Sequence, residues 1–576
     1  MTLRKFSTEN YNFLINVLIA VNLFYRHIIV KKMFRLRNIQ YMDFYAKQRR
    51  LSGLTHVLQQ QATQAHVSKE NEIFPAARVI PMVVTKKEDA ILPFDDVPGP
   101  KALKYVSNVR HYLSEIGTQI TASMLTFGLN AGSYFNKRKP LRNLSTLFEE
   151  YGPVVRFISP VGADIVLINH PEHIQKVYTL EGDYPIRSSL DCLNKYRTEH
   201  RSHYCGGIYS VNGVEWVRQR SVVSTPLHDS VANNVQSLGL ICDNFIRKLY
   251  NIRNYQDEIS KDLYKELHKW AFDCMGLLIF SKKFTMIETE LVYSQCDMSW
   301  LYHSLEKATD AIIKCESGLH LWRFIRTPAW HSLVKNCDSL DNLIGKHVLE
   351  AEQTLCIRNK EELTNLHTLV HAMLLDKEKM SVEDITTIIM DMLLIGVNTV
   401  TSSMSFLLYY LAKYQRCQKK VYEEISKENI EDIMRETPYL EACIKETLRL
   451  APPIPILTRI LPKNIILDRY NIPRGTLIIM STQDASVKES NYDDATRFYP
   501  ERWLKDDVKD YHAFASIPFG SGPRKCLGQT MAETMLTLLI LKKFKLEYHY
   551  SDIQPTRSFI AKPNKSLKIR FVDRFQ

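Results

Sequence analysis

The sequence lacks the patterns that mark several common classes of protein. None of its 11 cysteines forms a C-x-x-C pair, which excludes a zinc ribbon and a dithiol redox motif. No G-x-G-x-x-G run, internal repeat or low-complexity tract occurs either. An odd, unclustered set of cysteines is a poor disulfide framework, so we expect most of them to be buried reduced thiols. The 576 residues, 45% hydrophobic and 24% charged, have the composition of a folded globular protein.

The body of the chain also lacks a strong excess of basic residues. The formal net charge is +12, but residues 1–92 carry 14 Lys and Arg against 6 Asp and Glu. Residues 93–576 therefore keep a net charge of only +4, without a basic patch interleaved with aromatic residues. This distribution argues against a nucleic-acid partner and assigns the basic excess to the leader.

The leader, residues 1–92, contains no apolar run of the length that a membrane span needs. The apolar run from Phe13 to Tyr25 has 13 residues, whereas a spanning helix takes about 20. It is similar to the core of a signal peptide or to a weak anchor, but no small-residue cleavage site follows. The next segment is rich in arginine and poor in acids, as mitochondrial presequences are. We therefore predict a targeting segment or weak membrane anchor, followed by a linker.

A catalytic domain is predicted for residues 93–576, starting at a proline-rich entry. Most segments up to Lys463 have apolar residues at helical spacing. Strand signals are short and grouped at 154–158, 165–168, 464–467 and 476–480. The expected fold class is mainly α with a smaller β region.

One cysteine lies in a loop suited to binding a haem iron. A thiolate ligand must stay deprotonated and must be aimed at one face of the porphyrin. Around Cys526, Gly522 permits a tight turn, Arg524 can pair with a haem propionate, and Gly528 opens the next helix. The amides of that helix would stabilise the thiolate. The alternative is a structural cysteine in a glycine turn, but the full pattern F-x-x-G-x-R-x-C-x-G, which begins at Phe519, is too specific to be common by chance.

This loop resembles the haem-binding loop of the cytochrome P450 superfamily, and the resemblance extends from residue 93 to the C-terminus. It implies the cytochrome P450 fold, with haem b buried between an oxygen-activating helix and the cysteine loop. It also implies that the Cys526 thiolate is the axial ligand of the iron.

Further motifs occur in the order typical of the family. Glu446 and Arg449, in Lys-Glu-Thr-Leu-Arg, can pair on one helix face, and the resemblance implies that Arg502 completes a buried structural cluster with them. Trp216 and Arg220 have the W-x-x-x-R spacing that in the family directs both side chains at the haem propionates. Arg459 matches another propionate ligand.

The oxygen-activating helix is predicted from an apolar run. Ser381 and Asp384 form a plausible capping box before the run from Ile385 to Leu411, which we interpret as a buried core helix rather than a membrane span. Its centre reads Ile-Gly-Val-Asn-Thr. The resemblance implies that Gly396 opens space beside the haem and that Thr399 hydrogen-bonds dioxygen and guides protons to it. Asn398 stands where the family has an acid, and an amide cannot relay a proton by ionising, although it can position water.

The resemblance implies a monooxygenase that inserts one atom of dioxygen into a small apolar substrate, with electrons from a separate donor because no flavin or nucleotide fingerprint is present. The chain resembles the animal mitochondrial clan. This resemblance implies a sterol or steroid substrate, with ecdysteroid hydroxylation as the narrower form. It also implies a location on the matrix side of the inner mitochondrial membrane. The donor would be ferredoxin with its NADPH-dependent reductase, for which Lys445 and Lys525 are candidate contacts. Glu441, Gln529 and Thr530, however, stand where mitochondrial relatives typically have basic residues.

Several alternatives stay open. One is a P450 of the endoplasmic reticulum that oxidises fatty acids or xenobiotics with NADPH-cytochrome P450 reductase. Another is an oxygen-independent haem-thiolate isomerase, against which Thr399 speaks. A third is a haem sensor or carrier without catalysis. Peripheral membrane association is expected for the monooxygenase.

Overall fold

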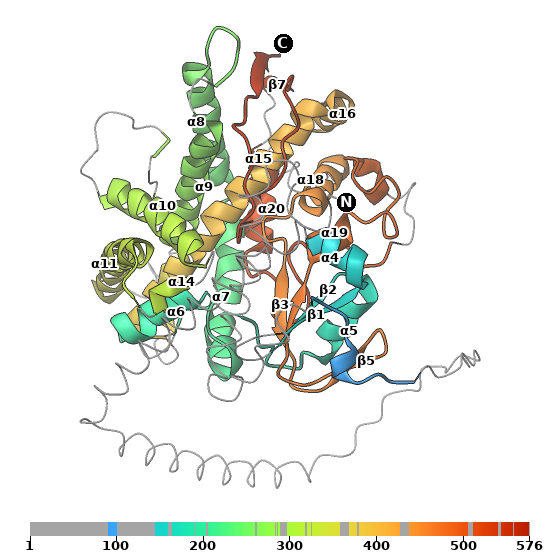
Figure 1. Ribbon diagram of the computed structural model, residues 1–576. Coiled ribbons are helices and arrows are strands. Elements are labelled where there is room, and N and C mark those ends of the chain that lie inside the picture. The colour runs from blue at the N-terminus through green and yellow to red at the C-terminus, as the bar shows by residue number, and fades with distance from the viewer. Residues whose placement is uncertain are drawn as a thin grey trace, which may run out of the picture. The chain divides into compact units, whose positions relative to one another are not determined.

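The described part of the chain in the computed structural model consists mainly of helices, together with strands that form three sheets (Figure 1). Nearly all of the predicted leader lies outside the described residues, so its role and its boundary at residue 93 stay predictions. The structure describes residues 90–100, 144–158, 164–188, 190–202, 206–259, 262–282, 284, 286–287, 297–316, 320–323, 325–357, 368–376, 380–426, 437–504, 511–539, 543–556 and 558–574.

The helices dominate the middle of the chain, as the apolar spacing predicts. Their bounds are η1 Phe94–Asp96, α4 Leu144–Tyr151, α5 Pro171–Leu180, α6 Asp191–Lys195, η3 Tyr196–His200, α7 Gly213–Asn233, α8 Val235–Ile252, α9 Leu263–Phe280, α10 Asp297–Glu316, η4 Leu321–Arg323, α11 Pro328–Ile357, α13 Leu369–Leu375, α14 Val382–Asp391, η5 Met392–Val397, α15 Asn398–Lys413, α16 Gln415–Ile425, α18 Pro438–Leu450, α19 Thr482–Ser486, η6 Pro500–Trp503 and α20 Gln529–Leu538. Of these, η3 and η5 are π-helical.

The largest sheet has the strand order β1-β2-β6-β3 and joins the two ends of the helical block. Strands β2 and β6 are parallel, and the outer pairs are antiparallel. The four predicted strand segments correspond to β1, β2, β4 and β6, whereas β3, β5, β7 and β8 were not predicted. The strands are β1 Val154–Phe157, β2 Ile165–Ile168, β3 Leu457–Ile460, β4 Ile465–Leu467, β5 Tyr470–Ile472, β6 Leu477–Met480, β7 Phe544–Glu547 and β8 Arg570–Asp573.

The predicted core helix runs through the centre of the helical region as α14, η5 and α15, and we call it the oxygen helix (Figure 1). Ser381 accepts a hydrogen bond from the Asp384 amide at 3.1 Å, and the Asp384 carboxylate accepts one from the Ser381 amide at 3.2 Å, so the predicted capping box forms. Among the described residues, the helix Val382–Lys413 is the one long and apolar enough to cross a membrane, but 78% of its apolar window is buried. The prediction of a core helix is confirmed.

The main hydrophobic core surrounds the oxygen helix with side chains of α9, α10, α18 and α20. The described cysteines are free thiols, and all are buried except Cys356 and Cys526. The predicted free thiols are therefore confirmed for these nine residues, seven of which are buried.

Candidate functional site

The cysteine loop is a closed turn in front of α20. The Cys526 amide donates to the Phe519 carbonyl at 2.8 Å, and the Lys525 amide donates to that of Gly522 at 3.0 Å. Gly522 has φ +69°, and a Cβ there would lie 2.0 Å from Oε1 of Glu181. Glycine is thus required by backbone conformation and by space, as the sequence predicts for this position.

Cys526 borders a cavity of about 180 Å³ between α7 and the start of α20. Burial raises the pKa of the thiol, while the Gly528 amide and the charges of Arg220 and Arg187 lower it. The helix N-terminus therefore directs a hydrogen-bond donor at the sulfur, as expected. The other lining residues are Arg220, Ser224, Leu227, His228, Val231, Leu527, Thr530 and Met531.

Trp216, Arg220 and Arg524 come together beside this cavity. The guanidinium of Arg524 lies 4.4 Å from the centre of the Trp216 ring, and that of Arg220 lies 5.6 Å from it. Arg524 donates to the Val211 carbonyl at 2.5 Å, and Arg220 donates to the Lys525 carbonyl at 2.8 Å. The helix α7 and the cysteine loop therefore present two cations on one indole ring.

Arg187 and Arg459 join Arg220 and Arg524 in a cluster of positive charge. Burial and the charges of Arg187, Arg459 and Arg220 lower the pKa of Arg524 to about 9. Within the described part of the chain, Nε and Nη1 of Arg524 are buried and find no hydrogen-bond partner. A cluster of four guanidinium groups, in which Arg524 has two unsatisfied donors, fits the two carboxylates of a haem, since charge-assisted bonds would satisfy those donors. The residues present thus fit the cofactor that the sequence predicts.

Two members of this arrangement were missed by the sequence analysis. Arg187 donates to the Tyr209 carbonyl at 2.9 Å, and its guanidinium lies 4.1 Å from the Tyr209 ring centre. Glu181 is buried at the end of α5 and forms an ion pair with Arg459, and burial raises its pKa. No local spacing links Arg187 or Glu181 to the cysteine loop, so only the fold could reveal them.

The oxygen helix offers one accessible face, at its π-helical turn. Between residues 385 and 409 every residue is buried except Met392, Ile395, Gly396 and Thr399, which share one helix face. The Thr399 hydroxyl donates to the Gly396 carbonyl at 3.1 Å. Gly396 and Thr399 are therefore brought to the same face, as the sequence predicts.

Methionine side chains border the space that Gly396 was expected to open. A Cβ on Gly396 would lie 2.9 Å from the Met275 methyl and 4.0 Å from the Met531 methyl. Met531 also lines the cavity with Cys526. The oxygen helix and the cysteine loop thus lie on two sides of Met531, and the Met275 methyl packs directly against Gly396.

Asn398 is not brought to the accessible face. Its side chain is 1% exposed and donates to the Thr309 hydroxyl at 3.1 Å and to the Leu394 carbonyl at 3.0 Å. The amide is therefore enclosed between the oxygen helix and α10, whereas the sequence analysis grouped it with the catalytic positions.

Glu446, Arg449 and Arg502 form a fully buried cluster. Both carboxylate oxygens of Glu446 accept from Arg449, at 2.7 and 2.8 Å, and Oε1 accepts from Arg502 at 3.0 Å. The Trp503 indole adds a bond of 2.9 Å. The three residues that the resemblance groups are thus brought together in a structural role.

The candidate donor contacts Lys445 and Lys525 are exposed. Lys445 lies 3.8 Å from Glu441 on α18, and both side chains are 57% exposed. A surface pair of this kind contributes little to stability. The side chains of Lys445 and Lys525 are therefore both available to a partner.

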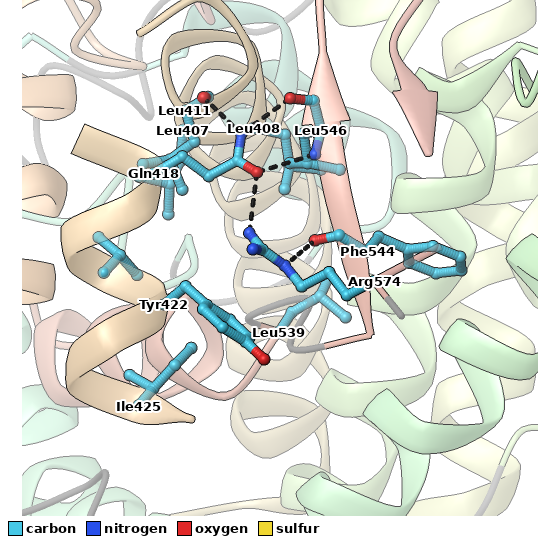
Figure 2. A pocket seen from close by; sticks show the side chains of 11 residues that line it. Leu407, Leu408, Leu411, Gln418, Tyr422, Ile425, Leu539, Phe544, Leu546 and Arg574 are labelled. Carbon is cyan, nitrogen blue, oxygen red and sulfur yellow. Dashed lines mark hydrogen bonds between the residues drawn. The ribbon is translucent and has the colours of Figure 1, made fainter. Parts of the chain in front are cut away.

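A second cavity, of about 30 Å³, lies between α15, α16 and β7 (Figure 2). The Gln418 amide donates to the carbonyls of Leu411 and Leu546, both at 2.8 Å, and its oxygen accepts from Arg574 at 3.0 Å. Figure 2 shows the Gln418 side chain bonded to Arg574 and to backbone groups rather than directed at open space. With room for roughly one or two waters, this cavity is a structural junction.

Comparison with known proteins places these features in a family. A sequence model described as Cytochrome P450 matches residues 122–571. The probable mitochondrial cytochrome P450 301a1 of Drosophila melanogaster is 26% identical over 501 residues, which cover 83% of this chain and 87% of that protein. The mitochondrial 1,25-dihydroxyvitamin D(3) 24-hydroxylase of Mus musculus is 26% identical over 460 residues, covering 76% and 85%.

A solved structure has a similar fold. The haem domain of cytochrome P450DA matches with a TM-score of 0.65 at 15% sequence identity, covering 84% of this chain and 99% of that one. At this identity the likeness concerns the fold alone.

Proposed function

The chain belongs to the cytochrome P450 family, and from that premise we propose which residues hold its haem, which substrate class it oxidises and which partner supplies its electrons. Family membership makes it a monooxygenase with a cysteine-thiolate-ligated haem. An electron donor and dioxygen are required.

We propose Cys526 as the thiolate ligand, held by the turn that starts at Phe519 and Gly522 and by Gly528 at the head of α20. The observation that carries this assignment is the cluster of positive charge formed by Arg524, Arg220, Arg187 and Arg459, in which the unsatisfied donors of Arg524 call for carboxylates beside the cavity. When bound, the haem supplies the activation of dioxygen, which the thiolate promotes by donating electron density.

The residues of the oxygen helix complete the proposed site. The Thr399 hydroxyl, which donates to the Gly396 carbonyl, is the group on the accessible face that can hold and pass a proton. Met392 and Ile395 share this half-buried face and offer apolar contact. Because a threonine stands on this face, the family's oxygen-dependent chemistry is favoured over an oxygen-independent isomerase.

We propose a sterol or steroid as the substrate. The accessible face of the oxygen helix carries no charged side chain, which suits an apolar molecule. A relative with 26% identity is named as a hydroxylase of a vitamin D compound. Ecdysteroid hydroxylation is the narrower form of this proposal, and fatty acids or xenobiotics are the alternative.

For the partner we propose a ferredoxin in the mitochondrion, at the matrix side of the inner membrane with which the enzyme associates peripherally. Relatives named as mitochondrial and the exposed lysines 445 and 525 support it. Glu441 beside Lys445 weakens an acidic partner's attraction, so NADPH-cytochrome P450 reductase of the endoplasmic reticulum is the alternative.

The test is a carbon monoxide difference spectrum of the reduced protein, followed by turnover. We expect a thiolate-type spectrum that is lost in Cys526→Ala and kept in Cys443→Ala, a buried thiol of α18. A sterol panel, with fatty acids for comparison, is then tested with ferredoxin and with the microsomal reductase in parallel. A thiolate spectrum that persists in Cys526→Ala would refute the ligand, and product only with the microsomal reductase would refute the proposed partner.

A further inference from the structure

Glu181 contacts two parts of the proposed haem site that are far apart in the sequence. Its carboxylate forms an ion pair with Arg459 of β3, and each of the two residues is only 3% exposed. Its oxygen Oε1 lies against the backbone of the cysteine loop, because a Cβ on Gly522 would be 2.0 Å from it. One carboxylate at the end of α5 thus joins a strand to the loop that carries Cys526.

The contact at Gly522 lies within the turn that bears the proposed iron ligand. The Gly522 carbonyl accepts from the Lys525 amide at 3.0 Å, and the amide of Cys526 donates to the Phe519 carbonyl at 2.8 Å. Glycine at position 522 lets the Glu181 carboxylate approach the backbone more closely than a side chain would permit. A charge on Glu181 therefore stands against the turn that ends at Cys526.

Arg459 is held in one direction by contacts on several sides. Its Nε donates to Oε2 of Glu181, and its Nη1 donates to the Thr458 carbonyl at 2.8 Å. The guanidinium also lies 4.8 Å from the centre of the Tyr178 ring. Tyr178 is on α5, so the same helix supplies the ring and, at its end, the carboxylate. The direction in which Arg459 presents its charge thus depends on Glu181.

Glu181 places a negative charge in the interior. Its Oε2 accepts from Arg459, whereas Oε1 is buried and has no hydrogen-bond partner within the described ranges. Burial raises the pKa of the carboxyl group, while the Arg459 ion pair and the charge of Arg524 lower it. These two cations favour the ionised form, and a charge acts more strongly in a protein interior than in water.

From these contacts we infer that Glu181 is a positioning residue, which fixes Arg459 and places a negative charge against the cysteine loop, and which thereby lowers the reduction potential of the haem iron. The inference rests on the proposed binding of haem by Cys526 and the arginine cluster. A negative charge near the iron disfavours the uptake of an electron, and a protein tunes its haem through such surroundings as well as through the axial ligand. Without the carboxylate, the arginine cluster would make the iron easier to reduce.

The test is the midpoint potential of the haem-loaded protein, measured by dye-mediated titration without substrate or electron-donor protein. In Glu181→Gln we expect the reduction equilibrium to shift at least about threefold toward ferrous haem, which is roughly 28 mV for a one-electron couple. Arg459→Gln removes a positive charge and should shift the potential in the opposite direction. The double variant removes both charges, so its potential should lie between those of the single variants and close to wild type.

Two control variants separate the charge from other effects. Glu181→Asp keeps the charge on a shorter side chain, so thermal stability should fall while the potential stays close to wild type. Asp183 is exposed two residues further along, and Asp183→Asn removes the same charge where water and salt screen it. Its potential should equal that of the wild type.

The carbon monoxide spectrum of each reduced variant checks that the thiolate ligand is intact. If Glu181→Gln does not bind haem, the double variant is compared with Arg459→Gln alone, because loss of the carboxylate should raise the potential there as well.

An unchanged potential in Glu181→Gln with an intact thiolate spectrum would overturn the inference. An equal rise in Asp183→Asn, or shifts of the same sign in Glu181→Gln and Arg459→Gln, would overturn it too. Failure of the proposed function would look different: the thiolate spectrum would persist in Cys526→Ala, or the wild type would form no product with either donor. Neither of those results depends on Glu181.

Discussion

Arg197 and Asp391 form an ion pair in the core, with Nη2 2.6 Å from Oδ1 and side chains that are 1% and 2% exposed. Asp391 ends α14 where the π-helical turn begins, and its other oxygen accepts from the Tyr209 amide at 2.9 Å. The carbonyl of Tyr209 accepts from Arg187. The backbone of one residue, Tyr209, thus connects the oxygen helix to the arginine cluster.

Asp391→Asn should therefore destabilise the protein strongly. Removing one charge of a buried pair leaves the other uncompensated, which costs about 3–5 kcal/mol. Denaturant unfolding followed by the haem absorbance measures the loss. The matched control is Asp552→Asn, since Asp552 pairs with Lys413 at 2.6 Å but is 59% exposed, and we expect less than about 1 kcal/mol there. Equal losses in the two variants would contradict the prediction.

Gly522→Ala should impair haem retention by more than the strain of the left-handed backbone alone would cause. The left-handed conformation alone costs roughly 1–2 kcal/mol, and the new Cβ would also meet Glu181, which Arg459 holds in place. Gly475→Ala is the control because its φ is +79° with no atom within 4 Å. We expect the haem dissociation rate to rise at least roughly tenfold, or 1.4 kcal/mol, in Gly522→Ala only. Partial recovery in Gly522→Ala/Glu181→Ala would identify the clash as the cause.

Thr399→Ala should divert electrons from product to hydrogen peroxide. The variant loses the hydroxyl of the accessible face, and general acid–base groups typically contribute 10²–10⁴-fold. Product and peroxide per NADPH are measured together. Thr401→Ala is the control, because that hydroxyl is buried and donates to the Val397 carbonyl at 2.6 Å. Unchanged coupling in Thr399→Ala would remove Thr399 from the site.

Stability should fall as the pH decreases from 6.5 to 4, in part because of His173. Burial, followed by the charge of His170, lowers its pKa to about 4 from an ordinary 6.5. The unfolded chain takes up the proton first, so the contribution is complete above pH 6.5 and is lost toward pH 4. In His173→Leu the difference in unfolding free energy between pH 7 and pH 5 should shrink by about 2 kcal/mol. His549→Gln, at a side chain 61% exposed, should leave that difference unchanged.

The sequence by itself determined the features that depend on local chemistry. The glycines, the arginine and the cysteine of residues 519–528 indicate a haem-thiolate loop because each residue type serves the thiolate at a defined spacing. The capping box at Ser381 and the apolar run behind it predict the core helix, since both depend on near neighbours in the chain.

Only the tertiary structure decided how distant residues act on one another. Arg187 and Glu181 join the arginine cluster from a segment more than 330 residues before the cysteine loop, and no spacing predicts such an encounter. The placement of Asn398 depended on the tertiary structure as well, because its side-chain amide donates to the Thr309 hydroxyl of α10. Packing and hydrogen-bond partners, rather than the residue type, place that side chain in the core.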